Sequence, residues 1–309
     1  MNCPLVDPLV AIVTTDLSAI TRGRSVSESR LEGMAETGLG WVPANLSLTP
    51  FNTIVDPNPW GSRGDIRLVP DMTARFQTAR TGSATPFDLV VGDLIELDGN
   101  AWEGCSRTAL RQAAETLKAE TGLSVTAAFE HEFKLVGDNI PPAHSFSLSA
   151  LRRVDPFGPT LMSALDDAGL QPEVMITEFG DEQFEITCAP ADVIAAADRA
   201  VALREITREV GRKLGFHATF APKTAIDSVG NGVHIHFSLM AVDGQPATYD
   251  PAGPAGLSTK AAQFCAGILN HLPGILPLTA SSIPSYYRLK PHSWSSSYTW
   301  LADRDREAS

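Results

Sequence analysis

Short apolar and β-branched runs recur through the first hundred residues and predict strands separated by turns. These runs lie at 9–15, 66–69 and 88–95. Pro70 is expected to end the second run, because proline cannot donate to a sheet ladder. The stretch from 40 to 70 is rich in Pro, Gly and Asn, which indicates turns and loops. The pattern therefore predicts a small, strand-rich domain over residues 1–102.

The chain from 103 to 309 mixes helical and strand-like spacing of its apolar positions. Apolar residues at helical spacing predict a helix starting near Ser106 and further helices over 157–169, 190–214 and 257–281. Strand patterns cover 124–135, two segments within 174–186 that are separated by a turn at Gly180, and 233–239. Because helices and strands alternate irregularly, we expect an α+β fold and not a doubly wound sheet.

Composition and charge exclude several classes of protein. Hydrophobic residues make up 43% of the chain and charged residues only 19%, so a packed core is expected and wholesale disorder is not. The net charge is −12 and no basic run interrupts it, which argues against a nucleic-acid partner.

The apolar stretches and the cysteines indicate where the protein works. Asp7 and Asp16 interrupt the N-terminal apolar stretch, so neither a signal peptide nor a membrane span is predicted there. The four cysteines are scattered and form no CxxC, which indicates neither a disulfide framework nor a thiolate zinc site. We therefore expect a cytoplasmic protein without a membrane partner.

Three strand-like segments carry acidic or imidazole side chains at positions two apart, which face the same side of a strand. Glu130 and Glu132 form one such pair, and His234 and His236 form another. Glu178 and Glu185 flank the predicted turn at Gly180 and can face the same cavity. Four carboxylates in apolar surroundings repel one another unless a cation lies among them. Oxygen ligands with one imidazole suit Mg²⁺ or Mn²⁺ better than zinc.

Each of these pairs has an ordinary alternative explanation. A single Glu-x-Glu on a strand commonly marks a solvated face, and a single His-x-His occurs at structural sites and in zinc hydrolases. The order of several motifs along the chain carries more information than any one pair.

That order resembles the glutamine synthetase family, whose N-terminal domain is a β-grasp fold and whose catalytic domain has a curved antiparallel sheet. The resemblance extends from Asp16 to the last residue. The matching segments are Thr21–Arg24, Gly64–Asp71, Phe129–Phe133, Glu178–Glu185, Phe220–Lys223 with Gly230–Leu239, Ser285–Leu289 and Asp305–Ser309. The segments Phe129–Phe133 and Glu178–Glu185 resemble the two pairs of metal-binding glutamates of the family.

The resemblance implies a role for individual residues. The implied ligands of one divalent ion are Glu132, Glu178 and Glu185, and those of a second ion are Glu130 and His234. The implied nucleotide contacts are His236, Ser238 and Arg306, with Arg306 over the phosphates. The implied contacts of the amino-acid substrate are Gly230 and Arg288, where a planar guanidinium can bind a carboxylate with paired hydrogen bonds.

The implied reaction is an ATP-dependent ligation in two steps. The γ-carboxylate of a glutamate-like acid attacks the terminal phosphate of ATP, and an amine then displaces phosphate from the acyl phosphate. Glu178 is implied as the acceptor of the proton that the amine loses. The resemblance also implies a ring-shaped homo-oligomer, with each active site closed by a neighbouring subunit.

Departures from the family pattern fall on the amine side of the implied site. Asp181-Glu182 stands where the family has Pro-Gly, and Val229 stands where it has Asn. Trp294 stands six residues after Arg288, where ammonium-using members carry a glutamate. The flat apolar surface of an indole suits an organic amine better than ammonium. We therefore expect a γ-glutamyl-amide synthetase of the γ-glutamylpolyamine type.

The chain stops at Ser309 inside a motif, so an incomplete catalytic domain is expected.

Three alternative functions remain open on the sequence. The protein could be an ordinary glutamine synthetase that uses ammonium, or a non-catalytic relative with a regulatory or interaction role. A His-x-His zinc hydrolase is the third alternative, but it leaves Arg288 and Arg306 unexplained.

Overall fold

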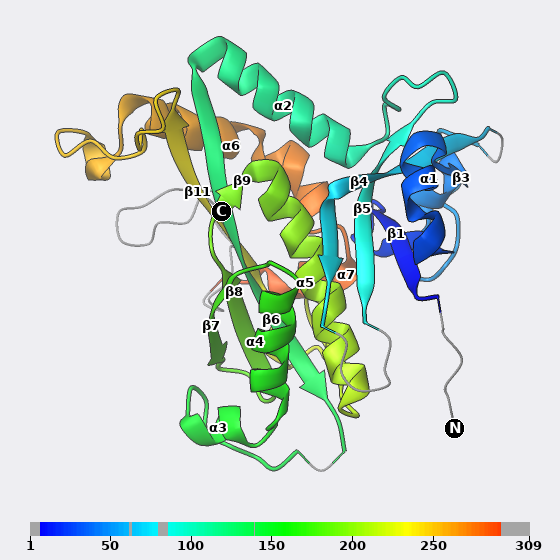
Figure 1. The fold of residues 1–309 in the computed structure, drawn as a ribbon. Helices are drawn as coiled ribbons and strands as arrows, with labels where there is room; N and C mark the ends of the chain where they lie inside the picture. Colours follow the sequence, from blue (N-terminus) through cyan, green and yellow to red (C-terminus); the bar gives the residue numbers. More distant parts are fainter. Residues whose placement is uncertain (1–6, 62–63, 80–85, 139, 292–309) are drawn as a thin grey trace. The chain divides into compact units, whose positions relative to one another are not determined.

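The structure is a computed structural model that describes residues 7–61, 64–79, 86–138 and 140–291 (Figure 1). It forms two compact units, each discontinuous in sequence. The first unit comprises Met1–Ala113, Pro159–Pro172 and Ala197–Lys213, and the second comprises Ala114–Gly158, Glu173–Ala196 and Leu214–Ser309. The domain boundary after residue 102 stays a prediction. Within the described ranges, no helix combines the length and apolar character that crossing a membrane requires.

A five-stranded sheet in the order β2-β1-β5-β4-β3 organises the first unit. Its strands are β1 (Leu9–Thr15), β2 (Thr21–Ser27), β3 (Leu39–Trp41), β4 (Ile66–Gln77) and β5 (Asp88–Ile95). Strands β1 and β5 are parallel, and the other printed pairs are antiparallel. Helix α1 (Leu31–Thr37) lies in the β2–β3 connection, with 3-10 turns at Glu28–Arg30 and Pro43–Ser47. The mixed sheet agrees with the predicted β-grasp domain.

Alternating side chains of this sheet build the core of the first unit. Val10 and Ile12, Ile66 and Leu68, and Val90 and Leu94 all belong to one buried cluster, with Trp41, Leu46, Trp102 and others. Residues two apart on a strand share a face, so the period-2 pattern of the sequence is sufficient to assign the buried side.

The prediction that Pro70 ends a strand was wrong, because β4 continues to Gln77. Strand β3 pairs with β4 only as far as Leu68, so Pro70 lies beyond the end of β3. The pairing of β4 with β5 then shifts register between Pro70 and Arg75. Proline is tolerated in a sheet at such a margin or bulge, where no ladder hydrogen bond is lost.

A six-stranded sheet around the long strand β6 (Leu123–Val136) organises the second unit. The other strands are β7 (Pro172–Thr177), β8 (Gln183–Cys188), β9 (Ala191–Asp192), β10 (His217–Thr219) and β11 (Val233–Ala241). Strands β8, β9, β10 and β11 all pair with β6 in antiparallel register. The rings of Phe133 and Phe184 lie 5.9 Å apart beneath this sheet, and Phe157 lies 6.1 Å from Phe133.

Seven helices complete the described fold, including α1. The remaining six are α2 (Ser106–Thr121), α3 (Leu148–Arg152), α4 (Phe157–Asp167), α5 (Val193–Lys213), α6 (Thr259–Thr279) and α7 (Ile283–Arg288). The predicted helices correspond to α2, α4, α5 and α6. Gly169 and Gly215 follow α4 and α5 with positive φ, as expected of glycines that end helices. The α+β fold class is therefore confirmed.

A buried charge network stabilises the first unit. Arg107 at the start of α2 is only 9% exposed and lies 2.7 Å from Asp71, 3.0 Å from Asp93 and 2.8 Å from Asp198. Arg111 lies 2.9 Å from Asp93 on the same helix. The guanidinium of Arg107 thus neutralises carboxylates from β4, β5 and α5 at one point.

We expect Arg107→Leu to lower the free energy of unfolding by about 3–5 kcal/mol, because it removes the arginine that pairs with the buried carboxylate of Asp198. Urea denaturation followed by circular dichroism measures this change. Arg152→Leu is the matched control: Arg152 pairs with Asp155 at 2.9 Å but is 61% exposed, so its loss should change stability by less than about 1 kcal/mol. Equal losses of unfolding free energy in Arg107→Leu and Arg152→Leu would contradict the stabilising role of the Arg107 network.

Candidate active site

The register of three antiparallel strands brings acidic groups and an imidazole to one face of the second sheet. Glu130 of β6 lies opposite His234 of β11. Glu132, two residues further along β6, lies opposite Glu185 of β8. Cross-strand partners share a face, and so do residues two apart. The predicted convergence of these side chains therefore follows from strand pairing alone.

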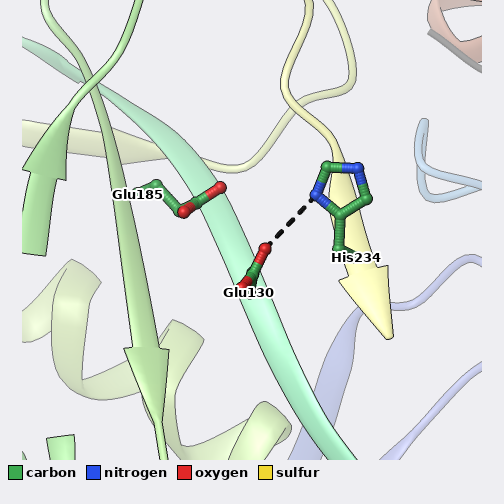
Figure 2. A group of neighbouring side chains, drawn as sticks. All are labelled: Glu130, Glu185 and His234. Atoms are coloured by element: carbon green, nitrogen blue, oxygen red, sulfur yellow. Dashed lines mark ion pairs between the residues drawn. The ribbon is translucent and has the colours of Figure 1, made fainter. Parts of the chain in front are cut away.

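Glu130, Glu185 and His234 form the tightest cluster. One potential ligand atom from each lies within 4.8 Å of the others. The Nδ1 atom of His234 is 3.5 Å from Oε2 of Glu130. Figure 2 shows the three side chains converging from three neighbouring strands, with Glu130 in the middle. Two carboxylates and one imidazole at this separation can hold a divalent ion.

The electrostatics of the cluster favour a cation. Burial, and then the charges of Glu130, Glu178 and Glu132, raise the pKa of Glu185 to about 7. Burial, and then the charge of Glu132, also raise the pKa of Glu178. Burial and mutual repulsion together make the ionised state of Glu185 and Glu178 unfavourable in the metal-free protein. A divalent cation would remove that penalty, so the residues present fit a metal ion.

The structure groups the predicted ligands differently from the expected sets. Among the described residues, Glu130 and Glu185 share a close cluster with His234, whereas Glu132 and Glu178 act on Glu185 through their charges. One oxygen of Glu132 is already engaged: Oε2 accepts hydrogen bonds from Gln183 Nε2 at 2.8 Å and from the Gly232 amide at 2.9 Å. The assignment of two separate ions to these residues stays a prediction.

The second histidine of β11 also faces Glu130. Nε2 of His236 lies 3.0 Å from Oε1 of Glu130, and its side chain is 62% exposed. Ser238 follows two residues later on the same strand and is also exposed. The two residues predicted to contact the nucleotide therefore lie on the same face as the metal cluster, at its exposed end.

Gly230 and Arg288 are in direct contact. A Cβ atom on Gly230 would lie 2.4 Å from Cγ and 2.6 Å from Cδ of Arg288, and 2.9 Å from the Pro222 carbonyl oxygen. Burial lowers the pKa of Arg288, while the charge of Glu132 raises it. Glycine at position 230 therefore makes room for a largely desolvated guanidinium beside the carboxylates. Such a guanidinium binds an anion strongly.

Two polar residues of this site were not singled out from the sequence. Gln183 is 3% exposed and Asn231 is 5% exposed, and they are joined by a hydrogen bond of 3.0 Å. The position of Gln183 two residues before Glu185 was the available signal, since it places both side chains on one face of β8. Arg306 and Trp294 lie outside the described residues.

The predicted turn at Gly180 between β7 and β8 is present. Within this turn the residue with positive φ is Glu182, at 59°. A Cβ atom on Gly180 would lie 2.6 Å from Oε1 of Gln183 and 3.1 Å from Cβ of Val229. Gly180 is therefore needed for close approach and not for its backbone angle.

Comparison with known proteins covers the whole described chain. Residues 103–309 match the glutamine synthetase catalytic domain, and residues 6–102 match the glutamine synthetase N-terminal domain. The gamma-glutamylpolyamine synthetase GlnA3 of Streptomyces coelicolor is 31% identical over 310 aligned positions, which cover 97% of this chain. Type-1 glutamine synthetase 1 of Dictyostelium discoideum is 32% identical over 67% of this chain.

Solved structures show the same fold. A crystal structure of a novel glutamine synthase homolog has 47% identity and a TM-score of 0.90, covering 95% of this chain and 70% of that one. The GmaS/ADP complex has 25% identity and a TM-score of 0.79, covering 95% and 67%.

The chain is shorter than its curated relatives. The aligned region makes up 65% of the Streptomyces protein and 46% of the Dictyostelium protein. Both parts of the chain nevertheless match domains of one family, in the order in which they occur along the sequence. The chain belongs to the glutamine synthetase family.

Proposed function

We propose that the protein is an ATP-dependent ligase that joins a glutamate-like acid to an organic amine through an acyl phosphate. The observation that carries this proposal is the register of β6 with β8 and β11. It gathers Glu130, Glu132, Glu185 and His234 on one face. Divalent cations among these carboxylates would neutralise charge on a phosphoryl group during transfer.

One group of residues at the site would hold the divalent ion, and another would bind the acid substrate. Glu130, Glu185 and His234 would hold a divalent ion, Mg²⁺ or Mn²⁺, with Glu132 and Glu178 completing the acidic surface. Arg288 would bind the α-carboxylate of the acid, and the close contact of its side chain with Gly230 supports a fixed position for the guanidinium. His236 and Ser238 would contact the nucleotide, and Arg306 its phosphates.

Glu178 would accept the proton that the attacking amine must lose. Its position after β7 leaves it half-buried, and burial together with Glu132 raises its pKa. A carboxylate with a raised pKa is a better base near neutral pH than an ordinary one. The acyl phosphate is consumed when the amine nitrogen bonds to the acyl carbon and phosphate leaves.

An organic amine is favoured over ammonium as the acceptor. Val229, which is 37% exposed, offers an apolar surface beside Gly180 at the site, where an amide would offer hydrogen bonds. Trp294 would offer another apolar surface. The name of the Streptomyces relative, a gamma-glutamylpolyamine synthetase, points in the same direction. Ammonium use and a non-catalytic role are the competing functions.

The protein is further proposed to form a ring-shaped homo-oligomer in the cytoplasm. In this assembly the β-grasp domain of one subunit would close the active site of its neighbour. Glutamate-like acid, ATP and amine would be its small-molecule partners.

The raised pKa of Glu185 predicts a pH dependence for metal binding. The unfolded group titrates near 4.5 and the folded one near 7, so the metal-free chain loses stability as pH rises between these values. Metal must displace the proton from Glu185. Mn²⁺ affinity should therefore rise by up to about tenfold per pH unit approaching pH 7 and level off above it. Titration calorimetry at pH 6, 7 and 8 measures this.

Glu185→Gln should bind Mn²⁺ weakly at every pH, and its metal-free form should lose less stability than the parent over the same pH range, because Glu178 keeps a raised pKa. Glu173→Gln is the control, because Glu173 is an exposed glutamate on the adjoining strand β7. Mn²⁺ affinity that is equal in the parent and in Glu185→Gln would sink the metal assignment.

The ligase activity is tested by phosphate release in a version of the chain that carries the full length of its relatives. With ATP, glutamate and Mg²⁺, organic primary amines should give a higher kcat/KM than ammonium. Glu130→Gln should reduce turnover by more than the roughly 10–100-fold typical of residues that only orient metal ligands.

Trp294→Glu should shift preference toward ammonium. The highest kcat/KM for ammonium in the parent would show that the acceptor proposal is wrong. No ATP-dependent phosphate release with any amine would favour a non-catalytic relative.

A further inference from the structure

Gln183 lies at the centre of the hydrogen-bond network behind the proposed metal site. It is the first residue of β8 and is 3% exposed. Its Oε1 accepts a hydrogen bond from the Gly180 amide at 3.0 Å. Its Nε2 donates toward three acceptors: Oε2 of Glu132 at 2.8 Å, the Gly230 carbonyl at 2.8 Å and Oδ1 of Asn231 at 3.0 Å.

The first consequence of this network is the orientation of Glu132. Its Oε2 receives the Gln183 amide and the Gly232 amide, so two donors fix one oxygen of the carboxylate. Hydrogen bonds to an ionised acceptor are stronger than bonds between neutral groups. The rotation of the Glu132 side chain is thereby set, and with it the direction of Oε1, which lies on the side of Gly232.

The second consequence is the position of the loop before β11. Asn231 is held through its side chain and its backbone: Nδ2 donates to the Ala221 carbonyl at 2.9 Å, and the backbone N–H donates to the Pro222 carbonyl at 2.9 Å. Gln183 binds this same residue and the carbonyl of Gly230, against which Arg288 packs. One side chain therefore links β8, β6 and the loop that supports Arg288.

We propose that Gln183 is a positioning residue that holds Glu132 and the Gly230–Gly232 loop in the geometry that the ion and the acid substrate both need. This inference rests on the proposed ligase function. An amide is required here because it offers donors to a carboxylate and a carbonyl together with an acceptor for the Gly180 amide. A carboxylate at this position would repel Glu132, and an apolar group would leave buried acceptors without donors.

The test compares Gln183→Met with a variant that weakens the same strand elsewhere. Methionine has nearly the size of glutamine but no donor. Phe184→Leu is the control, because Phe184 is fully buried on the opposite face of β8 against Phe133 and takes no part in the network. Gln183→Asn keeps the amide on a shorter side chain, and it decides the question if Gln183→Met does not fold.

Two quantities are measured on each variant: Mn²⁺ affinity by titration calorimetry, and the hydrogen-exchange rate of the Gly232 amide. Gln183→Met and Gln183→Asn should each weaken Mn²⁺ binding by about tenfold or more. Both should also speed exchange at Gly232, because the Glu132 oxygen that this amide binds is no longer held. Phe184→Leu should leave both the Mn²⁺ affinity and the Gly232 exchange rate equal to those of the parent within experimental error, although it lowers the stability of the same strand.

The outcomes separate this inference from the function on which it rests. If the parent binds Mn²⁺ and the Gln183 variants bind it equally well, the positioning role is overturned and the metal site stands. If Phe184→Leu weakens Mn²⁺ binding as much as Gln183→Met does, general destabilisation explains both and the positioning role is again overturned. If the parent binds no Mn²⁺, the proposed metal site fails and this inference fails with it.

Discussion

Electrostatic repulsion among carboxylates on one face of a sheet is the constraint on which the rest of the site depends. Glu132 and Glu185 are direct cross-strand partners, and Glu130 is two residues from Glu132 on the same strand. Like charges placed opposite each other destabilise a sheet. Burial, and then the charges of Glu130, Glu178 and Glu132, raise the pKa of Glu185 to about 7 in the metal-free protein. A divalent cation among these carboxylates would relieve the repulsion, so this face of the sheet fits a metal ion.

The sequence predicted most of this geometry because strands are periodic. Alternation identified β1, β5, β6 and β11, and positions two apart then placed Glu130 with Glu132 and His234 with His236. Register could not be predicted in the same way. Which glutamate lies opposite which residue depends on pairing between distant strands, so the close grouping of Glu130, Glu185 and His234 required the structure. Strand β2 (TRGRSVS) escaped prediction because its sequence lacks apolar alternation.

Other failures of sequence reasoning have local physical causes. The continuation of β4 past Pro70 depends on where β3 ends, which is a property of the neighbouring strand and not of the proline. Gln183 was not singled out, because its spacing from Glu185 shows only that it shares a face of β8 and not which groups it binds. Its importance comes from three acceptors that approach it from β6 and from the loop before β11. Residues that only orient others are therefore the part of an active site hardest to find without coordinates.

The protein treats its two acidic clusters in opposite ways, and the contrast bears on function. In the first unit, the guanidinium of Arg107 lies 2.7–3.0 Å from three aspartates, so cationic side chains of the chain itself offset part of their charge. In the second unit, the charges that act most on Glu185 are three other glutamates, opposed by His234. Among the described residues, Arg288 lies near Glu132, but no arginine is named among the causes that shift the pKa of Glu185. A divalent cation at Glu130, Glu185 and His234 would offset the repulsion among these carboxylates, so metal binding at this face would also stabilise the second unit.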